Sequence, residues 1–157
     1  MTRISIEDLV QLLAMMGIIG SLIFVGLEMR QSQRIAMAGQ QMERTAITTN
    51  GFTAFNEAGL DWHSVAFANR PELADQYPPS IAAGRNNFHQ TLFIYENDYF
   101  QFSQGLMPSD VWEAKLAGLE FYYNQCNYRE IMKVRKSFFS QGLIDIIDSL
   151  PDKCADE

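Results

Sequence analysis

Two histidines and nineteen acidic residues are the groups of this chain best suited to bind a metal ion. A carboxylate-bridged di-iron centre in a helical bundle needs a Glu-x-x-His pair on each of two helices and two further glutamates. Neither His63 nor His89 has a glutamate three residues before it. Cys126 and Cys154 are far apart and belong to no CxxC pair, so a closed zinc site is not expected either. We therefore expect no metal site and no cofactor.

The sequence also lacks the motifs of common catalytic and nucleotide-binding sites. It contains no Walker loop, no GxGxxG fingerprint and no GxSxG elbow. Cys126 has no neighbour in sequence that would activate its thiol. The chain is therefore predicted to be a non-enzyme without catalytic residues.

Glu96 is the best candidate for a functional carboxylate, because it lies beside an aromatic stripe with helical spacing. The stripe repeats at intervals of four, three, four and three residues: Phe88, Leu92, Tyr95, Tyr99 and Phe102. One interpretation of Glu96 is a structural carboxylate, paired with an arginine or with a tyrosine hydroxyl. The other is the polar anchor of a small-molecule pocket lined by Tyr95 and Tyr99.

The elements that would position these groups begin with an uncharged run at residues 9–27. Its nineteen positions carry no charge, in a chain that is 20% charged. A helix of this length spans about 28 Å, close to the ~30 Å hydrocarbon core of a bilayer. A cleaved signal peptide is one alternative, but the preceding segment is not basic. A buried core helix is the other, but such helices are usually shorter. We predict a retained transmembrane helix surrounded by lipid.

Small residues within this run form a pattern that permits close contact between helices. Gly17 and Ser21 are four residues apart, and Gly20 lies between them. Self-association through this face is one interpretation. The other is that glycine is simply common in membrane helices.

Arginines on either side of the run predict its orientation. Arg3 alone precedes the run, and three arginines follow it: Arg30, Arg34 and Arg44. Basic residues favour the cytoplasmic side, so the N-terminus is predicted outside and the C-terminal domain in the cytoplasm. Cys126 and Cys154 would then lie in a reducing compartment and remain unpaired.

The chain after the span is predicted to contain a stalk helix at 31–56, a helical domain at 57–150 and a frayed polar tail at 151–157. The stalk has no proline before Thr49, and Asn50-Gly51 is expected to bend or end it. Its apolar stripe follows helical spacing: Ile35, Ala38, Met42, Ala46, Phe52 and Phe55.

Further helices are predicted over about 53–68, 80–104, 109–123, 128–138 and 141–150, with a short turn at Pro71-Glu72-Leu73. Gly105 is expected to end the longest of them in a left-handed conformation. No segment alternates with a period of two, so the fold class is all-α. We expect one long transmembrane and stalk helix followed by a compact bundle of four or five shorter helices.

The charge of residues 31–157 limits their partners. Sixteen acidic residues oppose ten basic ones, giving a net charge of about −6, which disfavours nucleic acid. One basic cluster is interpreted as the solvated face of a helix: Arg129, Lys133, Arg135 and Lys136.

The whole pattern resembles a widespread family of short bacterial single-pass membrane proteins of unknown function. The resemblance rests on an RQ pair after the span, a PEL turn, a YENxYxQxxxGL segment, a following tryptophan and an FFS segment. The matching residues are Arg30-Gln31, Pro71-Glu72-Leu73, Tyr95-Glu96-Asn97, Tyr99, Gln101, Gly105-Leu106, Trp112-Glu113 and Phe138-Phe139-Ser140. A tryptophan pair typical of the family is replaced here by Ile131-Met132. The resemblance implies a bacterial inner-membrane location and a helical fold, and no particular activity.

Two functions fit these observations. The leading hypothesis is a membrane anchor that presents a cytoplasmic helical interaction domain and binds another protein, or itself, through the span and stalk. The alternative is a membrane-anchored sensor that binds a small ligand in an aromatic pocket near Glu96.

Overall fold

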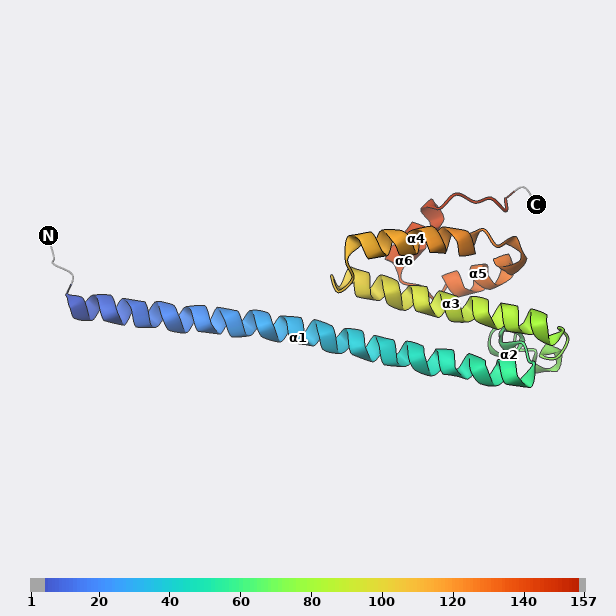
Figure 1. Ribbon diagram of the computed structural model, residues 1–157, viewed down its shortest axis with the longest axis horizontal. Helices are drawn as coiled ribbons and strands as arrows, with labels where there is room; N and C mark the ends of the chain where they lie inside the picture. The colour runs from blue at the N-terminus through green and yellow to red at the C-terminus, as the bar shows by residue number, and fades with distance from the viewer. Residues whose placement is uncertain (1–4, 156–157) are drawn as a thin grey trace. The chain divides into compact units, whose positions relative to one another are not determined.

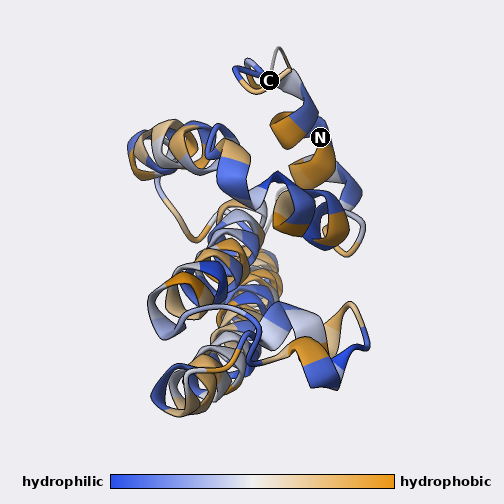
Figure 2. Cartoon of the chain, turned by 90° about the vertical axis from the view of Figure 1, so that its right-hand side faces the viewer, coloured by the Kyte–Doolittle hydropathy of each residue, from blue (hydrophilic) through white to orange (hydrophobic). Residues whose placement is uncertain are grey.

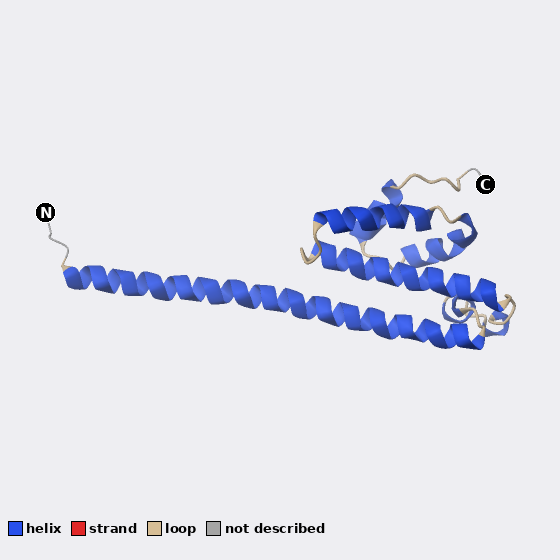
Figure 3. Ribbon diagram, viewed as in Figure 1, coloured by secondary structure: helices blue, strands red, loops and turns tan. Residues whose placement is uncertain are grey.

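The computed structural model describes residues 5–155, and every regular element within that range is helical (Figure 3). This confirms the all-α prediction. The elements are α1 (Ile6–Ala58), α2 (Trp62–Ala66), the 3₁₀ turn η1 (Pro71–Leu73), α3 (Pro79–Ser103), α4 (Ser109–Tyr123), the 3₁₀ turn η2 (Cys126–Tyr128), α5 (Arg129–Lys136) and α6 (Gln141–Ser149).

Helix α1 runs without a break through the position where the sequence predicts a bend (Figure 1). Gly51 lies inside the helix, and the chain leaves the helix only at Gly59, which has φ 69°. The Leu60 amide donates to the Phe55 carbonyl and the Gly59 amide to the Asn56 carbonyl, the two bonds of a Schellman motif. The prediction of an end at Asn50-Gly51 is therefore wrong. The prediction of a separate helix over 53–68 is also wrong, because residues 53–58 belong to α1.

The chain divides into two compact units after Met37, and α1 contributes to both. In the first unit, every residue of 9–27 is exposed, and α1 is long and apolar enough to cross a membrane. A helix from the core of a soluble protein would be largely covered by other elements. The interpretation of 9–27 as a buried core helix is therefore not supported, and a membrane span is compatible with the structure.

In the second unit, α1 contributes one face to a helical bundle. Ala38 and Phe52 are buried there, and the Gln101 side chain donates to the Ala38 carbonyl at 3.1 Å, fixing α3 beside α1. The predicted stalk stripe is only partly correct, because Ile35 and Met42 remain exposed. Partly covered polar side chains, including Gln41, take the intervening positions on the inward face.

The core of the bundle is built by α3, α4, α5 and α6. Figure 2 shows hydrophobic (orange) and hydrophilic (blue) residues alternating along the helical ribbons, as expected of helices with one apolar and one polar face. The core residues come from all four helices and from the turn before α6: Phe88, Leu92, Tyr95, Leu119, Ile131, Met132, Phe139, Leu143 and Ile147. Ile131 and Met132 therefore pack inside the bundle. Gly105, with φ 70°, ends α3 as predicted.

The segment after α6 is attached to the bundle. Cys154 forms a disulfide with Cys126, and the Asp152 carboxylate pairs with the Arg129 guanidinium at 2.6 Å. The prediction of two free thiols is therefore wrong. It depended on the predicted cytoplasmic location and on sequence spacing, whereas the fold brings η2 and the tail together.

Candidate functional site

Glu96 on α3 pairs with Arg135 on α5. The Arg135 Nη2 atom lies 3.2 Å from the Glu96 Oε2 atom, and the guanidinium lies 3.7 Å from the centre of the Phe93 ring. The Arg135 side chain is only 5% exposed, while that of Glu96 is 30% exposed. Burial raises the pKa of the Glu96 carboxyl, and the charge of Arg135 partly offsets this effect. The carboxylate therefore has the arginine partner that its structural interpretation requires.

The position of Arg135 differs from the one predicted for the basic cluster on α5. The sequence predicts a solvated helix face, but Arg135 is buried, with its guanidinium near the rings of Phe67, Phe93 and Phe139. Two of these rings, Phe67 and Phe93, are distant in sequence, so no local pattern identifies the position of Arg135.

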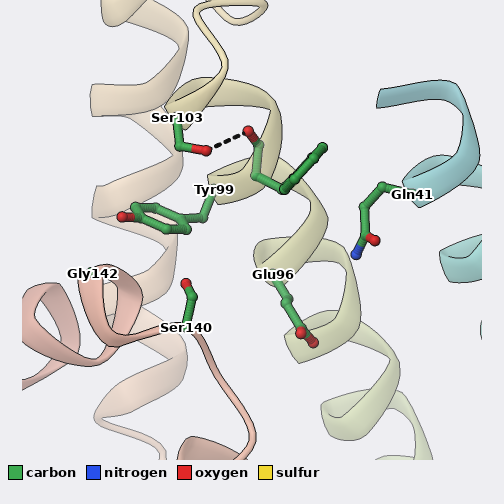
Figure 4. A pocket seen from close by; sticks show the side chains of 7 residues that line it. Gln41, Glu96, Tyr99, Ser103, Ser140 and Gly142 are labelled. Atoms are coloured by element: carbon green, nitrogen blue, oxygen red, sulfur yellow. Dashed lines mark hydrogen bonds between the residues drawn. The ribbon is translucent and has the colours of Figure 1, made fainter. Parts of the chain in front are cut away.

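Glu96 also borders a cavity of about 450 Å³ (Figure 4). The lining comes from α1, α3 and the start of α6: Gln41, Glu96, Tyr99, Phe100, Ser103, Ser140 and Gly142. Figure 4 shows Gln41 on one side of α3 and Tyr99 with Ser140 on the other. Gly142 leaves room for the Tyr99 hydroxyl, because a Cβ built on Gly142 would collide with it. The cavity therefore combines a carboxylate, an amide and hydroxyls with two aromatic rings.

Tyr95 does not line this cavity. Of the three predicted pocket residues, only Glu96 and Tyr99 border it. The Tyr95 ring packs against Tyr122 with ring centres 6.0 Å apart, and its hydroxyl lies against Gly118 of α4. Burial raises the pKa of the Tyr95 phenol. Tyr95 is thus a core residue, and Glu96 and Tyr99 remain as candidate pocket residues.

A second polar cluster lies between α2, α3 and α5 and contains both histidines of the chain. His63 Nδ1 lies 3.1 Å from His89 Nε2, and His63 Nε2 lies 3.7 Å from a Glu130 carboxylate oxygen. Burial lowers the pKa of His89 to about 2, with smaller effects from His63, Arg135 and Arg85, so His89 is neutral. Within residues 5–155, no three His, Cys, Asp or Glu side chains are grouped to hold a metal ion.

A buried ion pair beside the histidines joins α3 to the start of α2. The Arg85 Nε atom donates to Asp61 Oδ1 at 3.0 Å, and the other Asp61 oxygen accepts from the amide and hydroxyl of Ser64. Asn86 accepts from the Trp62 amide at 2.8 Å. The polar groups around this ion pair all bond to other groups of the protein. We therefore assign the ion pair a structural role in the fold.

The small residues of the uncharged run are exposed to solvent in the structure. Apart from adjacent residues and the local helix backbone, no described atom lies within 4 Å of a Cβ built on Gly17 or Gly20, and Ser21 is exposed. The face formed by Gly17, Gly20 and Ser21 is therefore available for helix contact, which remains a prediction.

The chain matches no family model, and it has no significant similarity to curated proteins or to solved structures. The resemblance to short bacterial membrane proteins therefore stays a prediction.

Proposed function

We propose that this protein is a single-pass membrane anchor that presents a helical interaction domain at the membrane surface. The exposed apolar run of α1 is the observation that carries the proposal. Every large apolar residue from Leu9 to Leu27 is at least 48% exposed, which would be costly for a helix in water. Lipid around residues 9–27 removes this cost.

An exposed apolar face on the stalk supports a protein partner. Ile35 and Met42 are seven residues apart in α1, so they lie on about the same helix face, and they are 54% and 60% exposed. Contact with a second copy of the chain, or with another protein, would bury this face. The acidic charge of the bundle argues against nucleic acid as the partner.

The domain is proposed to bind rather than to catalyse. Glu96 is engaged by Arg135, and the buried histidines contact each other and Glu130. These contacts are those of groups that stabilise a fold. Bacterial inner-membrane localisation belongs to the same proposal and rests on the family resemblance.

Site-specific photocrosslinking in intact membranes tests the interaction. A photoreactive amino acid at position 35 or 42 should give the same discrete crosslinked species, at twice the chain mass if the partner is a second copy. The matched control is a probe at Gln40, which is exposed on the opposite face of α1. Equal crosslinking from all three positions, or none from 35 and 42, would reject the proposed surface.

A second candidate function is ligand sensing through the cavity beside Glu96. The specific observation is that Glu96, Tyr99 and Phe100 border one cavity of about 450 Å³, within the usual range for small-molecule sites. Its hydroxyl, amide and carboxylate groups suit a polar organic ligand that also offers an apolar face to the rings.

Native mass spectrometry of protein purified from its own membranes tests the sensor function. A bound small molecule should accompany the wild-type chain and be lost in Ser103→Trp, which fills the cavity from its exposed rim. Thr53→Trp, at an exposed position on α1 outside the cavity, is the control. An unliganded wild-type protein would exclude this function.

The side of the membrane on which the bundle lies stays a prediction at this stage. The flanking arginines favour the cytoplasm, while the bond between Cys126 and Cys154 is of a kind that forms in oxidising compartments.

A further inference from the structure

The Cys126–Cys154 disulfide uses both cysteines of the chain. The two Cα atoms lie 5.5 Å apart, at the usual separation for native disulfides. The bond closes a segment with a sequence separation of 28, which contains the whole of α5 and α6. It therefore joins the segment after α6 to η2, the turn between α4 and α5.

Polar contacts beside the bond connect the same two segments of the chain. Arg129 pairs with Asp152 at 2.6 Å, and the Lys153 amide donates to Asn124 Oδ1 at 2.8 Å. The Lys153 ammonium group also lies 3.1 Å from a carboxylate oxygen of Glu120. These contacts hold the tail against the end of α4 and the start of α5. The disulfide is thus consistent with its surroundings in the native fold.

We infer that the helical bundle lies on the oxidising, non-cytoplasmic side of the membrane, with the N-terminal end of α1 toward the cytoplasm. Structural disulfides form and persist in oxidising compartments, whereas reducing systems keep cytoplasmic thiols free. In a bacterial inner membrane, this places the bundle in the periplasm. Its partners are then proteins, ligands or envelope components of that compartment.

This orientation is opposite to the one that the arginines predict, and the structure weakens the arginine argument. Arg44 lies in the part of α1 that folds with the bundle, which leaves Arg30 and Arg34 against Arg3. Moreover, the charge rule applies to short flanking loops, and long domains translocate largely regardless of their charge. The second unit extends from Ala38 to Glu157 and is such a domain. The disulfide is therefore the stronger indicator.

Reporter fusions to the full chain test the inference. Alkaline phosphatase fused after Glu157 is active only outside the bacterial cytoplasm, and green fluorescent protein exported through the same route stays dark. We expect an active phosphatase fusion and a dark fluorescent fusion. A bright fluorescent fusion with inactive phosphatase would overturn the inference.

The state of the cysteines is a second measurement on the unfused chain. Cells are quenched with acid, and the denatured protein is treated with maleimide-polyethylene glycol before or after reduction. We expect no modification before reduction and two additions after it. Two additions without reduction would show free thiols and contradict the argument.

A cysteine-free control separates orientation from bond formation. The Cys126→Ser/Cys154→Ser chain should keep an active phosphatase fusion, because the bond reports the compartment and does not set the topology. Loss of export in this variant alone would contradict that reasoning. This inference extends the proposed anchor, and fractionation distinguishes the two: an active fusion in the soluble periplasmic fraction would support the compartment but reject the membrane anchor.

Discussion

Replacing both cysteines, as Cys126→Ser/Cys154→Ser, should lower the free energy of unfolding of the bundle by about 3.6 kcal/mol. The disulfide restricts the unfolded chain by closing a segment with a sequence separation of 28. The loop-closure relation gives an entropy of about 12 cal/mol/K for this length, or about 3.6 kcal/mol at 25 °C. This is a large share of the stability of an ordinary domain, about 5–15 kcal/mol.

Tryptophan fluorescence during urea unfolding measures this loss selectively. The chain has two tryptophans, Trp62 in α2 and Trp112 in α4, and both lie in the second unit. The first unit, residues 1–37, contains no tryptophan and is therefore silent, so the full chain can be studied in detergent micelles. With a slope of about 2 kcal/mol/M, the midpoint should fall by about 2 M.

The wild-type chain under reducing conditions is the matched comparison, because it loses the bond without a change in sequence. It should unfold at about the same urea concentration as the double variant. A loss below about 1 kcal/mol in both samples would refute the loop-closure reasoning. A loss in the variant but not on reduction would show that the serines, rather than the missing bond, cause the effect.

Three further predictions concern the bundle. The pKa of His89 is lowered to about 2, so its contribution to stability is complete above its usual 6.5 and is lost as the pH falls. Unfolding should thus cost about 2 kcal/mol less at pH 5 than at pH 7, a difference that His89→Gln should reduce; an unchanged slope would contradict this. Gly59→Ala should cost about 1–3 kcal/mol because φ is 69°, whereas Gly51→Ala, inside the same helix with open space around it, should stabilise by about 0.5–1 kcal/mol. Equal thermal shifts for the two would refute the assigned helix end. Arg135→Met should cost about 2–4 kcal/mol by chemical denaturation, since it leaves the Glu96 carboxylate without its partner, and Arg135→Met/Glu96→Leu should recover part of this loss. No recovery would mean that the lost packing of Arg135, rather than the broken ion pair, causes the loss of stability.

Local patterns were sufficient to predict the elements that depend on neighbouring residues in sequence. The stripe from Phe88 to Tyr95 identified the buried face of α3, because one helix face collects positions three and four apart. Gly105 identified the end of α3, since a left-handed residue is needed there. The uncharged run identified the exposed segment of α1.

Features set by contacts between distant segments were not predictable in this way. Gly51 and Gly59 look alike in sequence, and only the bonds from Leu60 and Gly59 back into α1 distinguish the helix end. Arg135 resembles any surface charge until Phe93 and Glu96 are brought beside it by the fold.

The candidate site was predicted only in part for the same reason. Glu96 and Tyr99 were identified from their positions on α3, but the other cavity residues come from α1 and from the start of α6. The aromatic stripe beside Glu96 predicts that Tyr95 lines the pocket together with Tyr99. In a helix, adjacent residues point about 100° apart, and Tyr95 turns toward Gly118 instead.

Alkaline carbonate extraction of membranes from cells that produce the full chain tests the central claim most directly. If residues 9–27 span the bilayer, the wild-type protein should remain in the membrane pellet. Ile18→Lys/Ile19→Lys should move it to the supernatant, because each charge at the centre of a span costs about 2.5–3.5 kcal/mol. A wild-type protein that is released into the supernatant would contradict the membrane anchor.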